Sequence, residues 1–126
     1  MPKYERLHSK KQVSELFAEG SSFFQYPFRV VYSIKKSDGG EPPQMLISVS
    51  KKNIKKAVGR NRVKRLVREA YRLNKVTLVT ASLNQGKTIR FALIYAAKTI
   101  LSYAEIEKKI ILILQRLIEQ DEQTAG

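Results

Sequence analysis

Apolar residues recur at helical spacing within the first twenty positions of the chain. Ser9, followed three residues later by Gln12, has the form of a capping box that opens a helix. The apolar positions that follow are Val13, Leu16 and Phe17. Gly20 is suited to close the helix because glycine adopts the left-handed conformation at little steric cost. The pattern predicts a helix over residues 10–19.

The period of the pattern then changes to two, which is typical of an extended chain. One face of this segment carries six apolar side chains, namely Phe24, Tyr26, Phe28, Val30, Tyr32 and Ile34. Pro27 restricts its surroundings to a sheet edge, a bulge or a strand entrance, so we expect the strand over 28–36. A loop rich in glycine and proline covers 37–43. Residues 44–50 predict a second strand, antiparallel to the first across that loop.

Residues from about 57 to 74 combine an apolar and a cationic side on one helix. At about 100° per residue, one arc is apolar and holds Val63, Leu66, Val67, Ala70, Tyr71 and Leu73. The opposite arc is polar and holds Asn61, Lys64, Arg65, Arg68 and Arg72, with Arg60 and Arg62 at its borders. This pattern predicts a helix with one side in the core and an almost continuous cationic side in solvent.

The last third of the chain predicts a strand and a helix. Residues 76–87 are ambiguous, apart from a turn over 84–87. Residues 89–97 are apolar on both faces except for Arg90, which indicates a central strand. Ser102 and Glu105 have the capping-box form that opens a last helix. The buried stripe of that helix is Ile106, Ile110, Ile113, Leu114 and Leu117, and we expect a frayed tail over 120–126.

These elements predict an α+β fold. In the order α-β-β-α-β-α they form a two-layer sandwich in which helices cover a small mixed sheet. The chain has 126 residues, which fit a single domain over 1–126 with an ordered core of about 6–118.

The composition excludes several kinds of chemistry. There is no Cys, which rules out disulfides, thiolate metal sites and cysteine nucleophiles, and His8 is the one histidine, which rules out a multi-histidine zinc site. No apolar run reaches the roughly 18–20 residues that span a bilayer. The charged start of the chain lacks the apolar stretch of a signal peptide, so we expect a cytoplasmic protein.

The charge of the chain lies mainly in one segment. Of a formal net charge of +13, residues 51–75 contribute 11 basic groups against one acidic group, Glu69. Arg60/Lys64, Lys64/Arg68 and Arg68/Arg72 are like-charged pairs on adjacent helical turns, which repel by a few tenths of a kcal/mol each. A row of phosphates would compensate this repulsion, so we favour nucleic acid as the partner.

Other partners and roles fit the charge less well. A basic helix can also be solvated without a ligand or lie on a membrane, but the apolar side of this one lacks Trp and is needed to cover the sheet. No helix-turn-helix spacing surrounds it, which argues against a protein that binds the DNA major groove.

Residues 57–69, AVGRNRVKRLVRE, resemble the RNR signature of the bacterial ribonuclease P protein family. The preceding residues 48–52, SVSKK, resemble the end of the strand that leads into this signature. Arg6-Leu7, the FAEG that ends the first helix, and the order of the elements agree with the family as well. The resemblance therefore covers nearly the whole chain. It also implies a left-handed βαβ crossover, against the general right-handed rule.

The resemblance implies a protein subunit without catalytic residues in a ribonucleoprotein endoribonuclease. In that family the large RNA, with Mg²⁺, removes the 5′ leader from precursor tRNA. This sequence fits that role because it shows no acid/base pair or metal cluster of its own. The implied partners are the catalytic RNA and precursor tRNA, with no membrane and no small-molecule substrate. The alternative is a structural RNA-binding protein of the ribosomal type with no part in an enzyme.

The family motif implies which residues contact RNA. These are Arg60, Asn61, Arg62, Lys64, Arg65 and Arg68. Lys51 and Lys52 would extend this surface, and Arg72 continues the same cationic side. Asn61 is neutral and is implied to help hold an RNA-bound metal ion through water.

A second implied site is a cleft between the first helix and the sheet, which holds the single-stranded leader. Stacking on aromatic rings binds single strands with little sequence preference. Phe17 and Tyr32 match this role, whereas Val13 stands where the family has an aromatic residue and can pack against a base but not stack. The alternative for all three residues is an ordinary place in the core.

Overall fold

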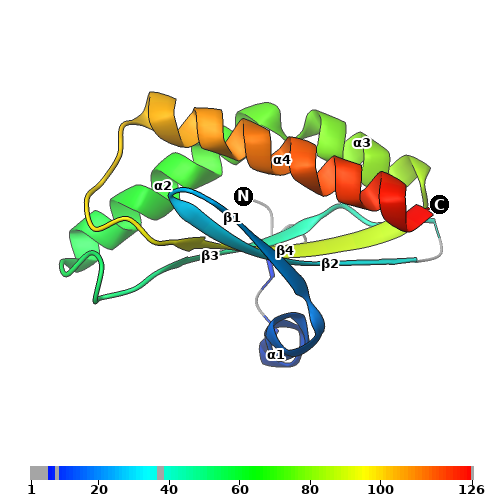
Figure 1. Ribbon diagram of the computed structural model, residues 1–126, viewed down its shortest axis with the longest axis horizontal. Helices are drawn as coiled ribbons and strands as arrows, with labels where there is room; N and C mark the ends of the chain where they lie inside the picture. Colours follow the sequence, from blue (N-terminus) through cyan, green and yellow to red (C-terminus); the bar gives the residue numbers. More distant parts are fainter. Residues whose placement is uncertain (1–5, 8, 37–38, 126) are drawn as a thin grey trace.

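The computed structural model describes residues 6–7, 9–36 and 39–125, with side chains up to Gln120 (Figure 1). His8 and the first two residues of the predicted 37–43 loop lie outside these ranges. The helices are α1 (Lys10–Glu19), α2 (Ala57–Asn74), α3 (Val76–Asn84) and α4 (Tyr103–Ala125). The strands are β1 (Ser21–Gln25), β2 (Phe28–Lys36), β3 (Gln44–Val49) and β4 (Lys87–Tyr95). The predicted α+β class is confirmed, with β1 and α3 as two elements that the sequence patterns did not predict.

The four strands form one mixed sheet in the order β1-β2-β4-β3. β4 pairs antiparallel with β2 and parallel with β3. The predicted antiparallel pair of 28–36 with 44–50 is therefore wrong. β4 separates these two strands because its side chains are apolar on both faces, and the centre of the sheet buries both. The prediction of a central strand is confirmed.

β1 and β2 form a hairpin at one edge of the sheet. Their register runs from Ser21 opposite Tyr32 to Gln25 opposite Phe28. The turn between them is Tyr26-Pro27, so Pro27 marks the entrance of β2, one of the three places that its chemistry permits. The alternating pattern of 24–34 thus belongs to two strands.

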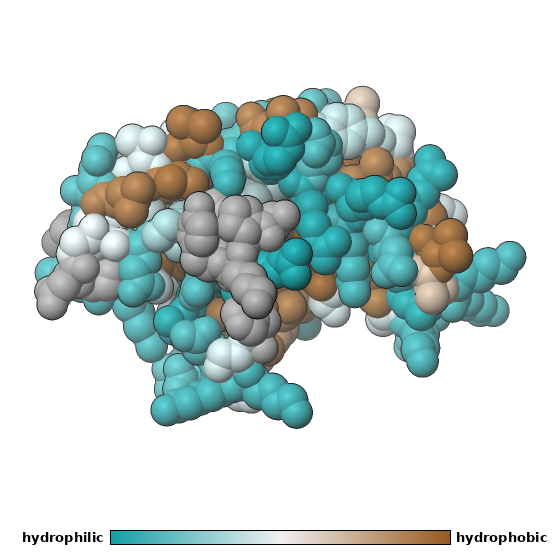
Figure 2. Space-filling view, turned by 180° about the vertical axis from the view of Figure 1, so that it is seen from behind, coloured by the Kyte–Doolittle hydropathy of each residue, from teal (hydrophilic) through white to brown (hydrophobic). Residues whose placement is uncertain are grey.

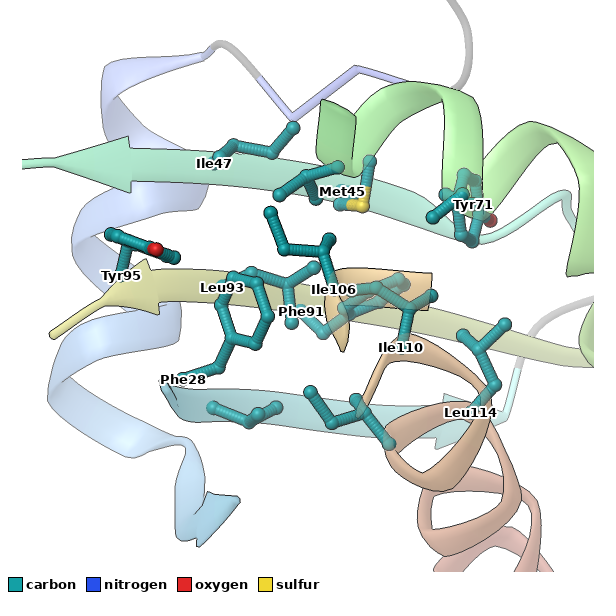
Figure 3. Close-up of a cluster of buried hydrophobic side chains, with 14 of the residues drawn as sticks. Phe28, Met45, Ile47, Tyr71, Phe91, Leu93, Tyr95, Ile106, Ile110 and Leu114 are labelled. Atoms are coloured by element: carbon teal, nitrogen blue, oxygen red, sulfur yellow. The ribbon is translucent and has the colours of Figure 1, made fainter. Parts of the chain in front are cut away.

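The main hydrophobic core lies between one face of the sheet and helices α2, α3 and α4 (Figure 3). Figure 3 shows Phe28, Met45 and Phe91 pointing from three strands toward Ile106 and Ile110 of α4. All five residues of the stripe predicted for the last helix are buried. That helix continues to Ala125, beyond the start of the tail expected from residue 120.

The connection from β3 to β4 passes through α2 and α3 on the side of the main core. Figure 3 looks onto the sheet from this side and shows β3 and β4 pointing the same way. The crossover has the left-handed sense that the family resemblance implies.

Helix α1 lies on the opposite face of the sheet (Figure 1). The predicted N-cap at Ser9 is confirmed, since the Ser9 Oγ accepts a hydrogen bond from the Gln12 N–H at 3.4 Å. Gly20 is extended (φ −71°, ψ 156°), so the predicted left-handed closure is wrong. A Cβ on Gly20 would lie 2.4 Å from the Leu16 carbonyl oxygen and 2.9 Å from that of Tyr32. The glycine is required here because the last turn of α1 approaches β2 closely.

Candidate nucleic-acid interface

Helix α2 separates an apolar side from a cationic side, as the pattern predicted. Val63, Val67, Ala70 and Tyr71 are buried against the sheet and α4. Leu73, which the helical arc placed with them, is 53% exposed, so its predicted place in the core is wrong: at about 100° per residue it lies at the border between the two arcs. The opposite side is polar and faces solvent.

The residues of the predicted contact surface lie together on this side of α2 and on the loop before it. Those that are exposed are Lys51, Lys52, Asn61, Arg62, Arg65, Arg68 and Arg72. Arg60 and Lys64 are half-buried. Within the described residues, the ion pairs are Lys35–Glu19 and Arg72–Glu69. The charges of Arg62, Arg65 and Arg68 therefore face solvent without an acidic partner there.

Arg60 has a structural role that the sequence did not show. Its Nη1 donates hydrogen bonds to the carbonyl oxygens of Ile54 at 2.9 Å and Lys55 at 2.7 Å. These bonds tie the loop after β3 to the first turn of α2. Arg60 therefore fixes residues 54 and 55, at the end of the loop that carries Lys51 and Lys52, besides contributing a charge.

Arg72 is held by a bidentate pair with Glu69. The Arg72 Nε and Nη2 donate to the two carboxylate oxygens of Glu69 at 3.1 and 2.6 Å. The hydrogen bond from Arg72 lowers the pKa of the Glu69 carboxyl below its ordinary value. Because this pair engages the guanidinium, Arg72 is less available to a ligand than Arg62, Arg65 and Arg68, which have no acidic partner among the described residues.

The three residues predicted for the leader cleft do not lie together. Val13 and Phe17 belong to α1, and Val13 packs against a small second core of Leu7, Leu16, Val31 and Ala92. Tyr32 lies on the other face of the sheet, where it packs against the main core and its ring centroid is 5.8 Å from that of Phe23. Side chains alternate along a strand, so Tyr32 shares the face of Phe28 and Val30. The placement of Tyr32 in this cleft is therefore a wrong prediction.

The face of the sheet next to α1 carries Val31 and Ser33 of β2 instead of Tyr32. A small groove there is lined by Gln12, Glu15, Leu16, Ser33, Lys35 and Arg90. The Arg90 Nε donates to the Gln44 Oε1 at 3.0 Å, which orients the guanidinium along the sheet. Phe17 is 47% exposed at this side of the molecule. The period-two alternation of the strand was enough to place Val31 and Ser33, and not Tyr32, on the face of the sheet next to α1.

The described residues hold no cluster of three or more His, Asp or Glu that could bind a metal ion. Asn61 is exposed on α2 and belongs to no such cluster, so it offers a single amide oxygen. That is too few ligands for Mg²⁺, which prefers octahedral oxygen coordination. Among the helices that the structure describes, none has the length and apolar character needed to cross a bilayer.

The fold and the site define a class of small α+β proteins that present one cationic helix beside a mixed sheet. The family model described as Ribonuclease P matches residues 1–118 of the chain. The ribonuclease P protein component of Chlorobaculum tepidum is 35% identical over 105 residues, which cover 78% of this chain and 68% of that protein. The chain therefore belongs to the Ribonuclease P family.

Other relatives agree with this family. The ribonuclease P protein component of Porphyromonas gingivalis is 51% identical over 75 residues, which are 60% of this chain and 55% of that protein. The match thus spans little more than half of that relative. The solved RNase P protein from Thermotoga maritima has a TM-score of 0.65 and 26% identity, covering 89% of this chain and 96% of that one.

Proposed function

We propose that this chain is the protein subunit of ribonuclease P and assists the removal of the 5′ leader from precursor tRNA. One observation carries the proposal: in a member of this family, the RNR segment of α2 presents Arg62, Arg65 and Arg68 to solvent without an acidic partner among the described residues. We expect the protein to act in the cytoplasm.

The cationic side of α2 binds the catalytic RNA through its phosphates. Arginine suits this task because its planar guanidinium donates two parallel hydrogen bonds to a phosphate. Each phosphate contact releases counterions, so binding weakens as salt rises. Lys51 and Lys52 extend this contact, and Arg60 keeps their loop against the helix.

The protein positions RNA, and the RNA carries out the hydrolysis. Mg²⁺ bound to the RNA would supply an activated water for attack on the phosphodiester. Asn61 lies on the cationic side and would help to hold such an ion only through water, since one amide oxygen cannot hold it alone. The side chains of the protein orient the two RNAs relative to each other.

The leader of precursor tRNA lies along the side of the sheet that carries α1. Phe17 is exposed there and offers a ring for stacking on a base. Val13 adds apolar contact near it, and Arg90 supplies positive charge from β4. Tyr32 has no part in this contact because it lies on the other face of the sheet.

Reconstitution tests the proposed function. The chain is added to a cognate bacterial ribonuclease P RNA at low Mg²⁺, and leader removal from precursor tRNA is measured. We expect stimulation of cleavage. Binding to the RNA without stimulation would indicate a structural RNA-binding protein and would overturn the proposal.

A further inference from the structure

A groove of about 610 Å³ lies between the start of α2 and the β4–α4 connection. Its volume is within the range of roughly 300–1,000 Å³ that is common for small-ligand sites. Segments far apart in the sequence build it, since residues 52–59 form one wall and residues 98–100 the other. None of the residues that line it is acidic.

The floor of the groove is apolar and open to solvent. Val58 is 80% exposed and Ile100 is 37% exposed, while Ile54 beneath them is buried. Gly59 is required for this arrangement, because a Cβ there would lie 2.8 Å from the Ile54 Cγ2 and 3.5 Å from the Ile100 Cδ1. Figure 2 shows a hydrophobic patch at the end where α2 begins, with hydrophilic side chains projecting around it.

The rim of the groove is cationic. It consists of Lys52, Lys55, Lys56 and Lys98, which are all exposed. The N-terminus of α2 opens at the same place, with Lys56 as a cap that makes no side-chain hydrogen bond and with no acidic residue in the first turn. Four cations beside the positive end of a helix dipole repel one another and the helix end, so this end of the molecule favours an anion.

Hydrogen bonds fix the two walls relative to each other. The Asn53 Nδ2 donates to the carbonyl oxygen of Tyr95 at 3.3 Å, which links the loop before α2 to the end of β4. The buried Tyr95 hydroxyl donates to the Thr99 carbonyl oxygen at 2.8 Å and accepts from the Leu101 N–H at 3.1 Å. The groove is thus held open in advance, which lowers the entropic cost of binding.

We propose that this groove binds one unpaired nucleotide of an RNA chain. The base rests on the apolar floor against Val58 and Ile100, and the flanking phosphates contact the rim lysines and the first amides of α2. A phosphate alone would leave the apolar floor uncovered, whereas a nucleotide uses both parts. This inference rests on the proposed function for its RNA partner, and it adds a contact to a base to the phosphate contacts along α2.

Binding of the full chain to its cognate catalytic RNA, measured at several salt concentrations, tests the groove. Val58→Ser and Ile100→Ser remove the floor, and the matched controls Val76→Ser and Leu83→Ser remove apolar side chains of similar exposure on α3, at 70% and 42%. We expect each floor variant to lose affinity on the order of fivefold, from the apolar area that a base no longer covers, with an unchanged salt slope. Lys98→Gln should lower the slope by about one, and the controls should match the parent.

The outcomes separate the groove from the proposed function. If the parent chain binds RNA and stimulates cleavage while the floor variants match their controls, the groove proposal is wrong and the function stands. If Val58→Ser weakens binding to anionic phospholipid vesicles and leaves RNA affinity unchanged, the groove is a membrane contact and the proposal is wrong.

A crosslink identifies the nucleotide directly. A photoreactive phenylalanine analogue at position 58, compared with the same analogue at position 76, is irradiated in the complex with RNA. We expect the position-58 crosslink at an unpaired nucleotide and a weak, scattered signal from position 76. Crosslinks from position 58 confined to base-paired nucleotides would contradict the proposal.

Discussion

The two faces of the sheet carry two proposed RNA contacts that are assembled in different ways. On the side of α2, the cations come from one helix and the loop before it, so the local sequence determines their arrangement. On the side of α1, the surface combines side chains of α1, β2 and β4, and strand register determines which of them meet. A surface encoded in one helix can be recognised from its pattern, whereas a surface made by several strands needs the fold.

The two sides also differ in the size of their hydrophobic cores. The main core joins three helices to the sheet, whereas the core under α1 consists of four buried residues and a few partly buried ones. A small core at the edge of solvent relaxes more easily around a cavity. The α2 side should therefore account for most of the stability of the fold.

The largest expected effect is a difference between the two cores in the stability lost when one buried side chain is truncated. Ile110→Ala opens a cavity in the main core and should lower the free energy of unfolding by about 4 kcal/mol. Leu16→Ala in the core under α1 should cost about 2–3 kcal/mol, because α1 can settle toward the sheet. Urea denaturation of both variants measures the difference, and a greater loss for Leu16→Ala would contradict it.

The next largest effect concerns the cationic side of α2. The double change Arg65→Ala and Arg68→Ala should lower affinity for the catalytic RNA by about 100-fold at moderate salt, at roughly 1.4 kcal/mol for each lost charge-assisted contact. Thermal stability should not fall, because the change removes like-charge repulsion with Lys64 and Arg72. Lys108→Ala with Lys109→Ala on α4 is the matched control, since it removes the same charge elsewhere, and fluorescence anisotropy measures both. An equal loss for the two pairs would mean that binding follows net charge alone.

A smaller effect sharpens the role of the α1 side. Phe17→Ala should reduce the preference for precursor over mature tRNA on the order of fivefold, through the loss of one stacking contact. Tyr32→Ala should instead lower the stability of the fold and weaken the binding of precursor and mature tRNA equally, because the Tyr32 ring packs against the main core. Competition binding with the two tRNAs distinguishes these results. A selective loss of precursor binding in Tyr32→Ala would reverse the assignment.

The smallest expected effect comes from removing the Glu69 carboxylate, which makes the Arg72 guanidinium available to RNA. Glu69→Gln removes the bidentate pair and should raise RNA affinity less than about threefold at low salt, as one guanidinium becomes available. The pair lowers the pKa of Glu69, so its stabilisation is present above the ordinary pKa of 4.5 and is lost as the pH falls below that value. Melting temperatures of the two proteins should therefore converge in acid, and affinity measured at neutral pH tests the release. Unchanged or weaker binding in Glu69→Gln would show that Arg72 does not contact RNA.

The local elements could be predicted from the sequence, and their pairing could not. The bounds of α1, β2 and α2 follow from capping residues and hydrophobic period, which act over a few positions. The partner of β3 depends on β4, which comes about forty residues later, so the short loop after β2 wrongly suggested a hairpin. β1 was missed because its alternation continues into β2 across Tyr26-Pro27.

The candidate site shows the same limit. The α2 cations can be recognised from the sequence because they lie on one helix. Lys98 lines the same groove as Lys55 and Lys56, but it is more than forty residues away in the sequence, so only the folded structure shows that they are neighbours. No signal in the sequence connects the β4–α4 connection to the start of α2. Tyr32 was misplaced although the alternation of β2 already put it on the face of Val30, opposite Val31.

The salt dependence of RNA binding tests the central claim, that the α2 side is the RNA contact, most directly. The slope of log affinity against log salt is measured for the parent chain, the Arg65/Arg68 variant and the Lys108/Lys109 control. We expect the α2 variant to reduce the magnitude of the slope by about two, which corresponds to two lost phosphate contacts, and the α4 control to leave the slope unchanged. An unchanged slope in the α2 variant, or an equal decrease in both, would contradict this claim.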